Sequence, residues 1–271
     1  MDVHGVIRSM FGVPRALLGT IHAQALPGTP SSRFTVHEIA EQAAAEAEIY
    51  ARAGVHGLIL ENTHDRPYVK STANGPEIVA AMSIVGAAIR RASNLPLGIQ
   101  VLAGANRAAI AVAHACGAAF VRAEGFVFAH VADEGFIESS AGDLLRYRRA
   151  IGADNVHVFA DIKKKHSAHA ITADVDIAET AKAAEFFVVN GVVVSGAATG
   201  SPADPAEVES VSHAVTVPTL IGSGITPENI ASYAAADAFI VGSSVKRDGI
   251  WSGDLDFART RAVVDALARM A

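Results

Sequence analysis

Short apolar runs rich in β-branched residues alternate eight times with segments of helical periodicity along this chain of 271 residues. Strands buried on both faces of a sheet read as such runs, and a helix supplies the crossover that two parallel strands need. The expected strands lie in residues 16–23, 57–62, 97–102, 119–125, 156–162 and 191–196, and in the apolar first halves of 218–229 and 238–246. Eight such units predict an α/β protein, specifically a closed (β/α)8 or TIM barrel.

An open, doubly wound sheet is the main structural alternative. That fold carries a Gly-x-Gly-x-x-Gly turn after an early strand, whereas the first expected strand here leads into Leu26-Pro-Gly. A TIM barrel of about 250 residues fills the chain, so residues 1–271 are expected to form a single domain.

Capping residues place several helix boundaries. Thr35 and Glu38 have the spacing of a capping box, and Gly54 is expected to end the helix that they begin. A long loop is expected over 126–139, and a closing helix over 254–270. Further helix starts are predicted at Gly75-Pro76, Asp204-Pro205 and Thr226-Pro227.

Two glycine-serine turns follow the last two expected strands. Glycine lets a backbone approach a ligand closely, and free backbone N–H groups favour an anion. In TIM barrels the loops after strands seven and eight frequently form a phosphate site. The alternative is that both turns are only tight connections. The residues expected to bind phosphate are Gly222, Ser223, Gly224, Ile225, Gly242, Ser243 and Ser244.

Polar residues gather at the expected carboxyl ends of the strands, where active sites of this fold lie. The densest piece is residues 161–166. Along an extended segment Asp161, Lys163 and Lys165 point the same way, so a carboxylate and an ammonium group are expected to face the barrel axis. Such a lysine could hold an anion, or act as a base or Schiff-base nucleophile if its pKa is lowered. A solvated basic loop is the alternative.

Glu61 and Asp161 each end an apolar strand, so the two carboxylates could flank a substrate as an acid and base pair. With His22 or His166 they could instead hold a divalent cation such as magnesium or zinc, although no fixed metal-ligand spacing is present. Glu61 could also form a structural salt bridge with Arg122. His22 could equally be a hydrogen-bonded histidine at the rim.

Composition narrows the expected partners. The formal net charge is −6, the pI is about 6.0, and Lys163–Lys165 is the one basic block, so nucleic-acid binding is not expected. Cys116 is the only cysteine, which excludes an intrachain disulfide and fits a reducing compartment. No signal-peptide pattern or long apolar segment is present, so we expect a cytoplasmic protein without a transmembrane segment.

Several motifs in order along the chain resemble the BtpA family, which also includes SgcQ-type proteins. They are His22-Ala-Gln-Ala-Leu-Pro-Gly-Thr-Pro30, Glu61-Asn62 with Asp65 and Pro67, Asp161 with Lys165-His166-Ser167, Gly196 with Thr199-Gly200, Gly222-Ser-Gly-Ile-Thr-Pro-Glu-Asn229 and Val241-Gly-Ser-Ser-Val-Lys246. The resemblance implies a barrel of the ribulose-phosphate-binding kind. It also implies two different roles, because the name-giving cyanobacterial member is linked to photosystem I accumulation whereas many bacterial relatives accompany sugar metabolism.

The leading functional hypothesis is an enzyme that acts on a small phosphorylated sugar or nucleoside-derived metabolite by isomerase or lyase chemistry. A non-catalytic assembly or regulatory factor of the photosystem I biogenesis type is the second hypothesis, and a phosphate-independent metal hydrolase is the third. No organic cofactor is expected, and a homo-oligomer is expected because barrels of this kind often pair. The expected catalytic residues are Asp161, Lys163, Glu61, His166 and His22, and the expected substrate-binding residues are Asn62, Gln100, Arg122, Glu124, Lys165, Thr199 and Gly200.

Overall fold

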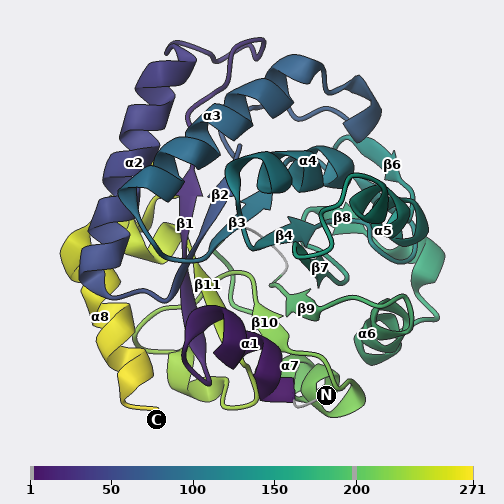
Figure 1. Ribbon diagram of the computed structural model, residues 1–271. Helices are drawn as coiled ribbons and strands as arrows, with labels where there is room; N and C mark the ends of the chain where they lie inside the picture. The colour runs from purple at the N-terminus through teal and green to yellow at the C-terminus, as the bar shows by residue number, and fades with distance from the viewer. Residues whose placement is uncertain (1–2, 197–199, 271) are drawn as a thin grey trace.

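Eight strands of the computed structural model, which describes residues 3–196 and 200–270, form a closed parallel barrel in the order β1-β11-β10-β9-β7-β4-β3-β2. Figure 1 shows the helices arranged around these strands. The predicted (β/α)8 barrel is therefore confirmed. The barrel strands are β1 (Ala16–His22), β2 (Gly57–Glu61), β3 (Leu97–Gln100), β4 (Phe120–Ala123), β7 (His157–Asp161), β9 (Gly191–Val194), β10 (Thr219–Ile221) and β11 (Ala238–Val241).

The helices begin and end close to the predicted residues. The capping box is formed, because the Thr35 side chain accepts from the Glu38 amide and the Glu38 side chain accepts from the Thr35 amide. Gly54, with a φ of 89°, ends this helix in the left-handed conformation that favours glycine. The described α-helices are α1 (Val3–Phe11), α2 (Val36–Ala53), α3 (Pro76–Ala92), α4 (Asn106–Cys116), α5 (Ala141–Ala150), α6 (Ile177–Phe186), α7 (Pro205–Ala214) and α8 (Phe257–Ala268). None of them is long and apolar enough to cross a bilayer.

The barrel interior is apolar toward the amino ends of the strands, a region we call the lower interior, and polar at the carboxyl ends. Side chains at every second position of a strand share a face, so the inward positions of β1 run from Leu18 through Thr20 to His22. The pairing register places His22 beside Glu61, and Glu61 beside Gln100. The side chains that fill the lower interior come from every barrel strand except β3, and include Leu18, Ile59, Phe120, Phe159, Val193, Leu220, Ala238 and Ile240.

Helix α1 precedes the first strand and packs on this lower interior. Ile7 and Phe11 are buried with the inward side chains of the barrel. The Phe11 ring meets the Phe120 ring edge to face, with 5.9 Å between the centroids. The sequence analysis did not predict this helix, which covers the end of the barrel opposite the polar ends of the strands.

The expected loop at 126–139 contains strands of its own. Strands β5 (His130–Ala132) and β6 (Gly135–Ile137) form a hairpin, and β5 also pairs with β8 (Ser167–Ala168), which follows β7. This small antiparallel sheet ties the loop after β4 to the loop after β7.

The helix predicted from Thr226-Pro227 is wrong. Only the 3₁₀ turn η3 (Ile230–Ser232) lies between β10 and β11 in the described chain. The Asn229 side chain explains the difference, since its Oδ1 accepts from the Thr226 amide at 2.8 Å and its Nδ2 donates to the Gly224 carbonyl at 2.7 Å. These bonds fix a closed turn in place of a helix start.

Candidate active site

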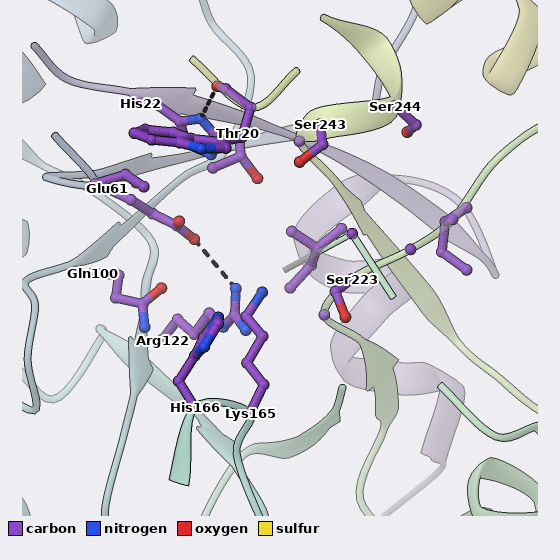
Figure 2. Close-up of a pocket in the computed structure, with 18 of the residues that line it drawn as sticks. Thr20, His22, Glu61, Gln100, Arg122, Lys165, His166, Ser223, Ser243 and Ser244 are labelled. Atoms are coloured by element: carbon purple, nitrogen blue, oxygen red, sulfur yellow. Dashed lines mark hydrogen bonds and ion pairs between the residues drawn. The ribbon is translucent and has the colours of Figure 1, made fainter. Parts of the chain in front are cut away.

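A cavity of about 770 Å³ lies at the carboxyl ends of the barrel strands. One wall carries charged side chains from β2, β4 and the loop after β7, and the other is made of the turns after β10 and β11 (Figure 2). The predicted site residues that line it are His22, Glu61, Gln100, Arg122, Glu124, Lys165, His166, Gly200, Gly222, Ser223, Gly224, Ile225, Gly242, Ser243 and Ser244. Thr199 lies outside the described residues.

Arg122 is the centre of the charged wall. Its Nε and Nη2 donate to the two oxygens of Asp161, both at 2.8 Å, and its Nη1 donates to Glu61 Oε1 at 3.2 Å. Burial alone would lower the pKa of Arg122, but the carboxylates of Asp161 and Glu61 raise it well above its ordinary value. Burial raises the pKa of Glu61, against the opposing effect of Arg122. Arg122 therefore stays charged while Glu61 is nearer to accepting a proton.

Two predicted site residues lie behind the cavity lining. Asp161 is buried, is absent from the lining and holds both ends of the Arg122 guanidinium. Asn62 is also buried away from the cavity, where its Nδ2 donates to Asp65 and its Oδ1 accepts from the Leu102 amide. Contrary to the expectation that Asp161 and Asn62 face a ligand directly, both lie outside the cavity lining with their polar atoms bonded to other residues of the chain.

The three consecutive lysines after β7 have different surroundings. Lys163 was expected to face the axis, but it lies outside the cavity lining and its Nζ donates to the Thr172 carbonyl at 3.1 Å. Strand geometry ends at Asp161, and Lys163 has a φ of 42°, so the alternation of an extended chain does not apply. Lys164, which the sequence analysis missed, lines the cavity and pairs with Glu124 at 3.4 Å. Lys165 lines the cavity as predicted.

His22 presents an unprotonated ring nitrogen to the cavity. Its Nδ1 lies 2.9 Å from the Trp251 carbonyl, which can only accept, so Nδ1 carries the proton and the neutral ring has Nε2 as an acceptor. Burial and then the charge of Lys246 lower the pKa of His22 to about 4. The neutral form is therefore the one present near neutral pH.

The two glycine-serine turns offer backbone donors. Within the described ranges, the amides of Ser223, Gly224, Ile225, Ser243 and Ser244 donate no hydrogen bond to the chain. The Gly222 amide differs, because it donates to the Val194 carbonyl at 2.8 Å. The Ser223 hydroxyl also serves the fold, donating to the Ser201 carbonyl and accepting from the Gly196 amide.

Glycine at the ends of β10 and β11 leaves the space between the two walls open. A Cβ atom on Gly222 would lie 2.8 Å from Arg122 Nη2, and one on Gly242 would lie 3.3 Å from His22 Nε2. Gly224 has a φ of 72°, and a Cβ there would collide with the backbone of Ser201 and Pro202. Larger residues at these positions would therefore displace the site's own side chains or the loop behind it.

The mouth of the cavity was largely missed by the sequence analysis. Asp133 and Glu134 line it from the β5–β6 hairpin, which sequence reasoning treated as a loop. Trp251 also lines the cavity; its ring lies 4.8 Å from the His64 ring in a tilted arrangement, and the Arg66 guanidinium lies over it at 4.7 Å. These contacts join loops distant in sequence, so no local pattern reports them.

The residues proposed as metal ligands do not form a ligand set. The described part of the chain contains no group of three or more His, Cys, Asp or Glu side chains placed to hold a metal ion. Glu61 and Asp161 both bind Arg122 instead.

The closed barrel and the polar cavity at its carboxyl end define a (β/α)8-barrel protein with a candidate active site where this fold places its active sites. The chain belongs to the BtpA family, whose family model matches residues 13–269. The resemblance inferred from the motifs is thereby confirmed.

Relatives match along most of their length. An uncharacterized mitochondrial protein of Caenorhabditis elegans is 48% identical over 260 residues, covering 94% of both chains. The Photosystem I biogenesis protein BtpA of Synechocystis is 34% identical, covering 95% of this chain and 90% of its own.

Among solved structures, a thiamine phosphate pyrophosphorylase from Pyrococcus furiosus has a TM-score of 0.61 at 11% identity, covering 97% of this chain and 98% of its own. The phosphoribosyl anthranilate isomerase of Thermus thermophilus has a TM-score of 0.57 at 12% identity, covering 94% of this chain and 100% of its own. At such identities the likeness shows the fold alone.

Proposed function

We propose that this protein is an enzyme that acts on a small phosphorylated sugar or nucleoside-derived metabolite by isomerase or lyase chemistry beside a carbonyl group. One observation carries the proposal: a single cavity has open backbone amides on one wall and buried titratable side chains on the facing wall. Amides that are fixed by a turn and have no acceptor among the described residues favour an anion with several oxygens, such as a phosphate group.

The phosphate group would bind the turn amides of Gly224, Ile225, Ser243 and Ser244. The binding energy of the phosphate group would hold the rest of the compound against the charged wall. Such positioning raises the rate of a reaction at that wall, away from the phosphate group itself.

Proton transfer would fall to His22 and Glu61. The Nε2 of neutral His22 can accept a proton, and burial raises the pKa of Glu61, which favours its protonated, proton-donating form. The Arg122 guanidinium would stabilise negative charge that develops on the carbonyl oxygen.

Thermal unfolding with a panel of compounds tests the proposal. Phosphorylated trioses, pentoses, hexoses and nucleosides are compared with the same compounds lacking phosphate, each with and without magnesium or zinc. A ligand at about 100 times its Kd adds about 2.7 kcal/mol to the free energy of unfolding, which is readily seen as a higher Tm. We expect stabilisation by at least one phosphorylated compound and none by its unphosphorylated counterpart.

Two matched variants locate the binding. Ser244→Asp places a negative charge in the phosphate turn and should abolish the stabilisation, whereas Ser210→Asp makes the same change on the exposed face of α7 and should preserve it. Equal responses in both variants, or no response to any phosphorylated compound, would contradict the proposal.

A non-catalytic role is the second candidate, favoured by the 34% identical Synechocystis relative that is named as a photosystem I biogenesis protein. It predicts that Ser244→Asp leaves the protein's biological role unchanged. Complementation of a strain that lacks the gene, with wild type and Ser244→Asp compared, separates the two candidates.

A further inference from the structure

Lys165 differs from its two neighbours, because its Nζ has no partner among residues 3–196 and 200–270. Lys163 Nζ donates to a backbone carbonyl and Lys164 Nζ pairs with Glu124. Lys165 Nζ makes no hydrogen bond or ion pair with any residue of the described ranges, although it lies in the wall of the cavity. A long amine placed in a cavity without a carboxylate to hold it is available to a ligand.

The surroundings of Lys165 lower the pKa of its amine. Figure 2 shows its side chain lying next to Arg122 and extending toward the centre of the cavity. Burial, followed by the charge of Arg122, lowers the pKa of Lys165, and the carboxylates of Glu61 and Asp161 oppose this only in part. Both of those carboxylates are bonded to Arg122, so within the described part of the chain the lysine lies beside a cation and forms no ion pair. Desolvation beside another cation is one of the ways in which a lysine becomes a nucleophile.

We propose that Lys165 is a catalytic nucleophile that forms an imine with the carbonyl carbon of the substrate. The inference rests on the proposed function, because the phosphate turns would set the position of that carbon. It deepens the function by assigning this chain to imine-forming chemistry on phosphorylated aldehydes or ketones.

The Nζ lone pair attacks the carbonyl carbon, the oxygen is protonated, and loss of one water molecule leaves the iminium. In a lyase, a base removes the proton of a β-hydroxyl, the carbon–carbon bond breaks, and its electron pair moves to the iminium to give an enamine. Protonation of the enamine carbon and hydrolysis by one water molecule release the second product and restore the amine.

His22 and Glu61 are placed for the proton transfers. Both side chains line the same cavity as Lys165. His22 Nε2 would accept the proton of the β-hydroxyl group. Glu61 would act as the proton donor.

Pyridoxal 5′-phosphate is a suitable probe, because it carries both an aldehyde and a phosphate group and the cavity of about 770 Å³ is large enough for it. The purified protein is incubated with it at a substoichiometric level, the imine is reduced with cyanoborohydride, and the modified lysine is identified by peptide mass spectrometry. Pyridoxal without phosphate is run in parallel, and inorganic phosphate is added as a competitor. Dihydroxyacetone phosphate with borohydride serves as a second, smaller probe.

We expect the adduct at Lys165, with at least about tenfold more from the phosphorylated aldehyde than from pyridoxal, and suppression by inorganic phosphate. Lys165→Arg should lose it, because a guanidinium keeps the charge but does not form an imine. Lys163→Arg is the matched control and should retain it, since Lys163 lies outside the cavity lining.

Labelling spread over Lys163, Lys164 and surface lysines, or equal labelling by pyridoxal, would overturn the assignment of Lys165. Stabilisation by phosphorylated compounds without any reduced adduct would overturn it too, while leaving the proposed function intact. If neither stabilisation nor an adduct is found, both proposals fail.

Discussion

At the scale of single residues, the charge balance of the site depends on Arg122. Its guanidinium holds Asp161 at two oxygens and Glu61 at one, all three side chains being buried. The sequence reasoning weighed an Arg122–Glu61 pair but not Asp161 as the main partner. Strand alternation predicts which residues face inward, but not which of several inward charges reach one another.

The lysine run shows a second limit of residue-scale prediction. Counting every second residue from Asp161 predicted that Lys163 and Lys165 face the axis, and only Lys165 does. Lys163 and His166 both have positive φ, so the chain turns twice within this short stretch. A run of like-charged residues does not indicate where the backbone turns.

The acid stability of the protein should depend on His22. Its pKa is about 4 in the folded protein and near its ordinary value of 6.5 when unfolded, so the unfolded state binds the proton more tightly. The neutral ring thus contributes stability that is complete above about pH 6.5 and is lost as the pH falls toward about 4. Burial is the main cause of the lowered pKa, the charge of Lys246 acts in the same direction, and the Trp251 carbonyl acts against it.

His22→Gln removes this titration. Across the same pH window the stability difference between wild type and variant should change by about 3 kcal/mol, to the disadvantage of wild type at low pH. Urea unfolding at a series of pH values measures this. A difference that stays constant with pH would show that His22 titrates normally in the folded protein.

At the scale of helices and strands, boundaries set by capping residues were predicted best, and features that depend on tertiary packing were predicted worst. Thr35, Glu38 and Gly54 were placed correctly because a cap is built from neighbours in sequence. The turn after β10 was not, because two side-chain bonds of Asn229 outweighed the helix start suggested by Thr226-Pro227. Helix α1 was missed because Ile7 and Phe11 pack on residues far along the chain, and no local pattern indicates such contacts.

Helix α1 should contribute strongly to stability through Phe11. Phe11→Ala would leave a cavity against Phe120 and cost about 3–5 kcal/mol, as is typical of a buried phenylalanine. Phe186→Ala is the matched control, because this side chain is 84% exposed and its loss should cost less than about 1 kcal/mol. Chemical denaturation of both variants is the measurement, and equal losses would show that α1 is not packed as described.

At the scale of the whole molecule, the repeated alternation of strand and helix was enough to predict the closed barrel and its active end. The two glycine-serine turns fall in the same cavity as the charged residues because the parallel strands of a closed barrel all end on the same face. The shape of the mouth was not predictable, since it depends on β5, β6 and β8, which pair across loops. The cytoplasmic location and the homo-oligomer remain predictions.

Amide hydrogen exchange should be faster in the small antiparallel sheet than in the barrel. The small sheet is short and exposes Val131 and Phe136, so the amides of β5 and β6 should exchange well before those of the barrel strands, which are buried on both faces. A bound phosphorylated ligand should slow exchange in the hairpin, because Asp133 and Glu134 line the cavity. Equal rates in the hairpin and the barrel, or a hairpin indifferent to the ligand, would contradict this division.

Helix α1 and the apolar layer beneath the cavity close the end of the barrel opposite the polar ends of the strands. We therefore expect a ligand of the cavity to enter and leave on the side of the carboxyl ends, where the β5–β6 hairpin also lies.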